Sequence, residues 1–294
     1  MKVLVLGGSG MLGHKLSQVL ARRFETWATV RGSVLDSVGL DSRRIIRGVS
    51  AENFESVENA LTAAEPNVVV NCIGIVKQDA AAKDRQRSIA INALFPHQVA
   101  RACASRGIRL IHLSTDCVFS GRRGNYKEDD VADADDIYGR TKWLGELDCE
   151  HCLTIRTSMI GRELSGSHGL IEWFLSQRDK SVRGFKQAIF SGFTTIALSE
   201  TIGNIIADAD DLHGVWHIAA DPINKFDLLS MVKNAFQLDI EIEPDETFVC
   251  DRSLDNSRFR ARTGFTTPSW EEMIDRMAHD ATPYEEIRRT HADR

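Results

Sequence analysis

Tyr138 and Lys142 are the two residues whose types and spacing point most directly to chemistry. They stand four residues apart, and Thr115 lies 23 residues before the tyrosine. On a helix, four residues make about one turn, so the phenol and the ammonium project from the same face. A lysine beside a tyrosine stabilises the phenolate and lowers a pKa that is about 10 in free solution. The pair is therefore suited to donating a proton near neutral pH, as the reduction of a carbonyl requires.

A glycine-rich segment near the start of the chain predicts a binding site for a dinucleotide. A short apolar run ends at Gly7, and an amphipathic run follows Gly13, so we expect a strand, a turn and a helix. Glycines at 8, 10 and 13 fit G-x-G-x-x-G, and those at 7, 10 and 13 fit G-x-x-G-x-x-G. In this context backbone amides can approach a pyrophosphate at the amino terminus of the helix.

The end of the second expected strand indicates which dinucleotide binds. An acidic residue there would hydrogen-bond the 2′-hydroxyl of NAD, whereas an arginine would accept the 2′-phosphate of NADP. The segment 26–32 carries no carboxylate and contains Arg31, with Arg43 and Arg44 as further cations. NADPH is therefore favoured over NADH, which stays the alternative cofactor.

Length and composition fit an ordinary enzyme. The 294 residues can bury a substantial core, and the net charge of −6 argues against a generally basic nucleic-acid-binding surface. No apolar stretch approaches the roughly 18 residues of a membrane span, and the chain enters a strand at once without a signal peptide. We expect a cytoplasmic protein that binds neither nucleic acid nor membrane.

Cys149 and Cys152 form a Cys-x-x-Cys pair among the six cysteines. Such a pair can bind zinc or carry out redox chemistry, but only His151 is an obvious further ligand and no second pair is present. We therefore predict that these cysteines pack in the core and that the protein has no metal site.

Strand-like and helix-like segments alternate through the first half of the chain. This alternation predicts a doubly wound parallel sheet of the Rossmann type, with a smaller carboxyl-terminal α/β region that binds substrate. We expect residues 1–160 to form the nucleotide-binding domain, with later segments able to return to it, and residues 161–294 to form mainly the substrate-binding region. Ligands in such sheets gather beyond the carboxyl ends of the strands. The expected strands are 2–6, 26–32, 45–46, 67–73, 109–113 and 215–218, and the expected helices include 54–64, 88–105, 170–177, 197–209 and 226–236.

Taken together, these residues resemble an extended short-chain dehydrogenase/reductase, and within it the dTDP-4-dehydrorhamnose reductase family. The resemblance covers nearly the whole chain. Its motifs are the glycine turn, Asn71-Cys72, Asn92, the block from Ser114 to Gly121 that includes Ser-Thr-Asp-Cys-Val-Phe, Tyr138-Gly-Arg-Thr-Lys142, Gly145-Glu146, Arg156-Thr-Ser158 and the segment 254–259.

The resemblance implies roles for individual residues. Thr115 would hydrogen-bond the substrate carbonyl, Tyr138 would protonate the developing alkoxide, and Lys142 would contact the nicotinamide ribose while tuning Tyr138. The implied cofactor-binding residues are Gly7, Gly10, Met11, Leu12, Gly13, Arg31, Val49, Cys72, Ile73, Gly74, Asn92, Ser114, Tyr138 and Lys142. The candidate substrate-binding residues are Thr115, Asp116, Cys117, Met159, Phe193, Arg252 and Arg258.

Three positions depart from the family pattern. Cys117 stands where a tyrosine is common, and Met159 stands where an aromatic residue is common, so two sugar-stacking surfaces are missing. Gly48-Val49 replaces a pair whose first member is often acidic. These changes concern the identity of the sugar and the adenine contact rather than the nicotinamide chemistry.

The leading expectation is an NADPH-preferring reductase of the 4-keto group of a nucleotide-linked 4-keto-6-deoxy sugar, such as dTDP-4-dehydro-L-rhamnose. This would place the enzyme in polysaccharide or glycoside precursor synthesis, with a nucleotide-diphosphate sugar as its substrate and a homodimer as one arrangement seen in the family. The alternatives are a nucleotide-sugar epimerase or dehydratase of the same superfamily, and a non-catalytic NADP-binding regulatory subunit.

Overall fold

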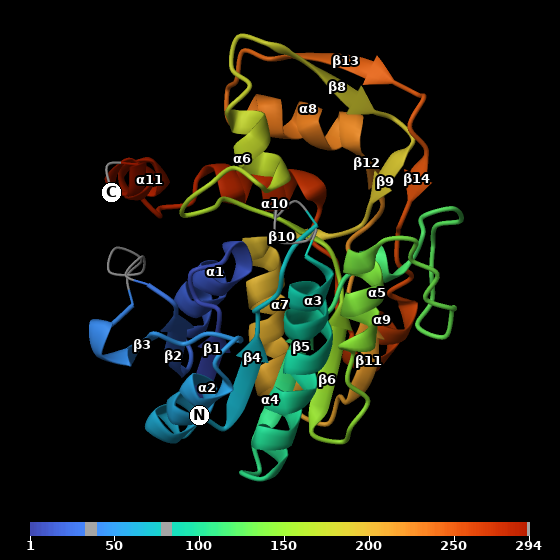
Figure 1. Ribbon diagram of the computed structural model, residues 1–294. Helices are drawn as coiled ribbons and strands as arrows, with labels where there is room; N and C mark the ends of the chain where they lie inside the picture. The colour runs from blue at the N-terminus through green and yellow to red at the C-terminus, as the bar shows by residue number, and fades with distance from the viewer. Residues whose placement is uncertain (33–39, 78–83, 293–294) are drawn as a thin grey trace. The chain divides into compact units, whose positions relative to one another are not determined.

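A seven-stranded sheet, built mainly from the first half of the chain and completed by a strand from the second half, is the largest sheet that the structure describes (Figure 1). The computed structural model describes residues 1–32, 40–77 and 84–292. The pairings of β1 with β2 and β4, and those of β2–β3, β4–β5 and β5–β6, are parallel. The expected doubly wound Rossmann sheet is thereby confirmed. In spatial order its strands are β3 (Ile45–Arg47), β2 (Glu25–Val30), β1 (Lys2–Leu6), β4 (Val68–Asn71), β5 (Arg109–Leu113), β6 (Cys152–Arg156) and β11 (Gly214–His217).

Helices cover both faces of this sheet. Successive side chains of a strand point to opposite faces, and here the side chains on both faces are largely apolar. On one face, α2 (Phe54–Ala64) and α4 (Phe95–Ala104) bury residues such as Leu61 and Phe95 against Leu4 and Leu6 of β1. The other face carries α1 (Met11–Leu20) and α7 (Thr195–Asp208), which lie side by side, since Arg23 beyond α1 donates a hydrogen bond to Asn204 over 2.7 Å (Figure 1).

The helix expected at residues 88–105 is broken into three parts. These are α3 (Arg85–Ser88), a π-helical segment η3 (Ile89–Leu94) and α4. π-Helical turns are uncommon and often mark functional sites. Here the wider turn holds Asn92, a predicted cofactor residue, whose side chain is almost fully buried.

The helix that carries Tyr138 and Lys142 is α5 (Ile137–Leu144), and the helical spacing expected for the pair is confirmed. An acidic side chain sets its beginning: Asp136 accepts a hydrogen bond from the backbone amide of Gly139 over 2.8 Å. Such a cap satisfies one of the amide groups that the first helical turn leaves without a backbone partner.

The second half of the chain forms small sheets with short strands. Two of them are pairs, β7–β10 and β8–β13, and the third has the order β12–β9–β14. The strands are β7 (Met159–Ile160), β8 (Ser181–Phe185), β9 (Ala188–Phe190), β10 (Phe193–Thr194), β12 (Ile223–Asn224), β13 (Glu241–Asp245) and β14 (Cys250–Asp251). The helices are α6 (Leu170–Leu175), α8 (Lys225–Ala235), α9 (Ser257–Thr263), α10 (Trp270–Ala278) and α11 (Tyr284–Ala292), and η1 (Ser42–Arg44) and η4 (Asp116–Val118) are short 3₁₀ turns.

The chain divides into two compact units that are interleaved in sequence. Unit 1 comprises Met1–Thr115, Asp135–Arg156 and Leu198–Trp216, and unit 2 comprises Asp116–Ala134, Thr157–Ala197 and His217–Arg294. The expected nucleotide-binding domain of residues 1–160 allowed later segments to return to it; here α7 and β11 lie largely in unit 1, and the segment 116–134 lies in unit 2. In the described part of the chain, none of the helices combines the length and apolar character that a membrane crossing needs.

Candidate active site

The glycine turn between β1 and α1 has the form that a pyrophosphate-binding loop needs. Gly7 has a φ of +83°, a conformation that side chains disfavour. A Cβ added at Gly13 would lie 2.1 Å from the carbonyl oxygen of Gly7, so helix and strand can approach this closely only without a side chain there. Gly10 is the N-cap of α1, and in the described chain no side chain caps this helix end. The first amides of α1 are therefore suited to binding a phosphate, and the residues present fit a dinucleotide.

The predicted cofactor residues of the next loop lie beside this turn. The amide of Cys72 donates a hydrogen bond to Leu6 over 3.0 Å, and a Cβ on Gly7 would meet the backbone of Cys72 and Ile73 at 3.3 Å. Asn92 fixes the far end of the loop, because its side chain exchanges hydrogen bonds with the backbone of Ile75 over 2.8 and 3.0 Å.

Gly74 connects this loop to the predicted proton-transfer pair. A Cβ added there would lie 3.3 Å from Oδ1 of Asn92 and 3.9 Å from Nζ of Lys142. From Gly7 through Ile73 and Gly74 to Lys142, the predicted cofactor residues thus form a continuous group within unit 1.

The residues predicted to hold the adenosine end follow β2 and β3. Arg31 is exposed directly after β2, where its guanidinium is open to a phosphate. Val49 is buried after β3, and its amide donates to Val30 over 3.1 Å. Arg43 is engaged by Asp41, with their charged groups 2.8 Å apart, so Arg31 is the better placed of these two arginines to contact a 2′-phosphate.

The catalytic candidates gather at the carboxyl end of β5. Ser114 and Thr115 follow that strand and are both buried, and Tyr138 is half-buried on α5. Lys142 is buried, and its Nζ donates a hydrogen bond to the carbonyl oxygen of Leu113 over 2.5 Å. Thr115, Tyr138 and Lys142 therefore belong to one unit, with the ammonium held two residues before Thr115.

The surroundings of Lys142 bring its titration close to neutral pH. Burial lowers the pKa of Lys142 to about 8, and the negative charge of Glu146 opposes that shift. His112 lies nearby, and burial together with the charge of Lys142 holds its pKa well below 6.5, so this histidine is neutral. Lys142 is thus a buried amine with a pKa of about 8, one helical turn after Tyr138 on α5.

The other predicted substrate residues lie in unit 2 and differ in their surroundings. Asp116 is buried, Cys117 and Met159 are half-buried, and Arg258 is exposed on α9. Phe193 is fully enclosed and packs on Phe265 with ring centroids 6.1 Å apart.

Arg252 is bound to the backbone of its own unit. Its guanidinium donates hydrogen bonds to the carbonyl oxygens of Phe119 and Ser120 over 2.8 and 3.2 Å. This arginine therefore holds the segment that follows Asp116 and Cys117.

Lys225, which belongs to none of the sequence motifs, is a cation beside the predicted substrate residues Asp116 and Cys117. It opens α8, and its Nζ lies 3.9 Å from the ring centroid of Phe190. Burial lowers its pKa to about 8, and the negative charge of Asp116 opposes that shift. These neighbours come from distant parts of the sequence, so only the fold reveals the group.

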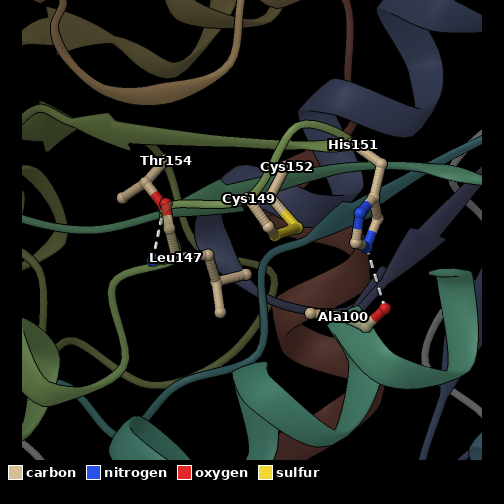
Figure 2. The surroundings of a disulfide bond; sticks show 6 residues. All are labelled: Ala100, Leu147, Cys149, His151, Cys152 and Thr154. Carbon is tan, nitrogen blue, oxygen red and sulfur yellow. Dashed lines mark hydrogen bonds between the residues drawn. A yellow bond between two sulfur atoms is a disulfide. The ribbon is translucent and has the colours of Figure 1, made fainter.

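Cys149 and Cys152, the Cys-x-x-Cys pair, form a disulfide bond at the amino end of β6 (Figure 2). Core packing is confirmed, since Cys152 belongs to the cluster under α2 and α4 and Cys149 packs against it. The bond between the sulfurs is a feature that the sequence did not predict. His151 lies close enough to complete a metal-binding group, but its Nε2 contacts the carbonyl oxygen of Ala100 at 3.0 Å, and bonded sulfurs are not thiolate ligands.

Comparisons with known proteins identify the family. The model of the RmlD substrate binding domain matches residues 1–282. A dTDP-4-dehydrorhamnose reductase of Streptomyces griseus is 35% identical over 144 residues, which is 49% of this chain and 43% of that protein, so the matched region spans less than half of that relative.

Solved structures share the fold over nearly the full length. A hypothetical dTDP-4-dehydrorhamnose reductase of Sulfolobus tokodaii has a TM-score of 0.76 at 26% identity, covering 92% of this chain and 98% of that one. A dTDP-4-dehydrorhamnose reductase of Bacillus anthracis, solved in complex with NADP, has a TM-score of 0.77 at 21% identity and covers 94% and 98%. With the Rossmann sheet and the glycine turn, these matches show that the chain belongs to the RmlD substrate binding domain family.

Proposed function

We propose that this protein is an NADPH-preferring reductase that acts on the 4-keto group of a nucleotide-linked 4-keto-6-deoxy sugar, such as dTDP-4-dehydro-L-rhamnose. The observation that carries the proposal is the position of the Lys142 ammonium, held on the carbonyl of Leu113 two residues before Thr115. The reductases among the relatives support the same substrate class.

The three catalytic candidates divide the work of carbonyl reduction. Bound nicotinamide supplies the hydride. Thr115 and Tyr138 donate hydrogen bonds to the keto oxygen, which stabilises the negative charge that grows there. Tyr138 then gives up its phenolic proton, and the ammonium of Lys142 stabilises the phenolate that remains.

NADPH is the proposed cofactor because of the residues available to hold it. The amides at the start of α1 bind the pyrophosphate, and exposed Arg31 binds the 2′-phosphate. Val49, Cys72, Ile73, Gly74, Asn92 and Ser114 complete the proposed cofactor contacts, with Lys142 at the ribose. In unit 2, Asp116, Cys117, Met159, Phe193, Arg252 and Arg258 stay the proposed substrate residues.

A panel of 4-keto nucleotide sugars tests the function directly. Purified protein is mixed with NADPH and each sugar, absorbance follows NADPH oxidation, and NMR identifies the product. The proposal requires one NADPH consumed for each keto group reduced. Conversion of sugar without net NADPH consumption would instead identify an epimerase or dehydratase. Stoichiometric capture of another enzyme without turnover of any sugar would identify a regulatory subunit.

For location and partners, we propose a cytoplasmic enzyme whose partner is the nucleotide sugar, without nucleic acid or membrane. The net charge of −6 supports the first exclusion. A homodimer is the proposed assembly, and sedimentation at micromolar concentration tests it, since a monomeric mass would reject it.

A further inference from the structure

Glu146 is a buried carboxylate next to the catalytic candidates. It stands two residues after α5 and four residues after Lys142. Its Oε1 accepts hydrogen bonds from the hydroxyl of Ser114 at 2.7 Å and from Nε of Arg156 at 2.8 Å. Its Oε2 accepts a further bond from the guanidinium of Arg156 at 2.7 Å. The side chains of Arg156 and Glu146 are only 5% and 7% exposed.

The partners of Glu146 stand at the ends of two neighbouring strands. Ser114 follows β5 and its amide donates to Ile155 of β6 over 2.8 Å, while Arg156 is the last residue of β6. One carboxylate thus ties the end of α5 to the ends of β5 and β6. The end of β5 is also where the carbonyl of Leu113 accepts the hydrogen bond from Lys142. Thr115, the proposed donor to the substrate carbonyl, follows two residues later.

Stability alone is a weak reason for such a pair. Removing two charges from water costs several kcal/mol for each ion, and apolar residues of similar volume are often as stable. A bidentate arginine does fix the orientation of a carboxylate. The oriented carboxylate then fixes the rotamer of Ser114, and its charge lies within the electrostatic reach of Lys142.

We propose that Glu146 is a positioning residue for carbonyl reduction. Its carboxylate, oriented by Arg156, fixes Ser114 and the strand end that carries Thr115, and its negative charge favours the ammonium form of Lys142, which stands four residues before it. This inference rests on the proposed function, because it assigns Glu146 a task only if Thr115, Tyr138 and Lys142 carry out the reduction.

Glu146→Gln tests both parts of the proposal in the full chain. The amide keeps the shape but loses the charge, so kcat should fall between about tenfold and a hundredfold, the usual effect of a misplaced supporting group. The decline of kcat at high pH should also move to lower pH, because Lys142 loses the charge that opposes its deprotonation. The affinity for NADPH at pH 6 should stay within about twofold.

Two variants of Ser114 separate positioning from charge. Ser114→Ala removes the hydroxyl and keeps the carboxylate, so kcat should fall while the high-pH decline stays where it is in the wild type. Ser114→Thr restores the hydroxyl and should recover most of kcat. This pair also tests the proposal if Glu146→Gln does not fold.

Glu172→Gln is the matched control. Glu172 forms a buried pair with Arg162 in unit 2, with the charged groups 2.5 Å apart and side chains 3% and 11% exposed. Its loss should lower the melting temperature without moving the pH profile. The proposal is overturned if Glu146→Gln behaves in the same way, or if Ser114→Ala keeps full kcat.

A measurement without turnover separates this inference from the proposed function. In ¹³C-lysine-labelled protein, with the resonance assigned through Lys142→Met, NMR should show a lower pKa of Lys142 in Glu146→Gln than in the wild type. An unchanged pKa would refute the electrostatic role even in an active enzyme. Absence of keto reduction in the wild type would refute the function but not this effect.

Discussion

Nζ of Lys142 lies 2.5 Å from the carbonyl oxygen of Leu113, the last residue of β5. This contact joins the helix that carries Tyr138 to the strand end that carries Thr115. Since Lys142 is buried, its charge is little screened by water, as its proposed action on Tyr138 requires. The predictions below follow from this contact and from the loops beside it.

The pH dependence of the reduction rate should reflect the deprotonation of Lys142. Burial lowers its pKa to about 8, so the ammonium is lost as pH rises through that value, and kcat/KM should decline there. Lys225 has a pKa of about 8 as well, again because of burial, so Lys225→Met serves as the control. The decline should persist in that variant. Its disappearance would assign the titration to Lys225 instead.

Arg31→Ala should lower the affinity for NADPH more than the affinity for NADH. The exposed guanidinium after β2 is proposed to bind the 2′-phosphate, and a charge-assisted contact of this kind contributes roughly 1.5–3 kcal/mol, or about tenfold or more in Kd. Fluorescence titration with both coenzymes measures the ratio. Arg22→Ala, an exposed arginine just beyond the end of α1, is the control that should leave the ratio unchanged. Equal losses for NADPH and NADH in Arg31→Ala would reject a phosphate contact.

Two glycines of the turn should respond differently to alanine. At Gly10 a Cβ would be 3.4 Å from Gly7, an acceptable contact, and φ is −73°, so Gly10→Ala should fold normally. The Gly10→Ala variant should still bind NADPH with an affinity about tenfold lower, because the added methyl group blocks the approach of the pyrophosphate.

Gly13→Ala should instead destabilise the protein, because its Cβ would lie 2.1 Å from the Gly7 carbonyl oxygen. A cost of about 1–3 kcal/mol is typical of overpacking. Thermal unfolding and NADPH titration of both variants check the contrast. Normal NADPH affinity in Gly10→Ala would place the pyrophosphate elsewhere.

Reduction of the Cys149–Cys152 disulfide should affect stability slightly and catalysis not at all. The bond closes a loop of only four residues, for which loop entropy predicts at most about 2 kcal/mol, or a few degrees of melting temperature. It lies at the amino end of β6 (Figure 2). Ser114, Thr115 and the Lys142 contact lie instead at the carboxyl end of the neighbouring parallel strand β5.

A phosphine reductant applied to the wild type and to a Cys149→Ser, Cys152→Ser double variant tests this prediction. The melting temperature of the double variant should not respond to the reductant. A change of more than about twofold in kcat/KM of the wild type on reduction would show that the pair communicates with the site.

Most of unit 1 could be predicted because its signals are local. The run Val68–Val70 reads as a buried strand, the glycines 7, 10 and 13 mark the first turn, and α2 begins and ends at the predicted residues Phe54 and Ala64. Each of these patterns arises from residues adjacent in sequence, where backbone preference and apolar periodicity agree.

The features that could not be predicted depend on contacts between distant residues. Strands of two or three residues, such as β7 and β14, are too short to show an alternating pattern. The buried site of Lys225 is recognised only once Asp116 and Phe190 are seen beside it. The proposed role of Glu146 likewise depends on its contacts with Ser114 and Arg156. A single sequence does not show that these residues lie next to one another.

Tyr138→Phe, measured beside the wild type with NADPH and a 4-keto-6-deoxy nucleotide sugar, tests the central claim most directly. The variant should bind NADPH as the wild type does, because the aromatic ring is preserved, and it should lose roughly 10²- to 10⁴-fold in kcat because the hydroxyl that donates the proton is gone. Undiminished kcat in Tyr138→Phe, with NADPH still consumed, would remove Tyr138 from the reaction and contradict the account.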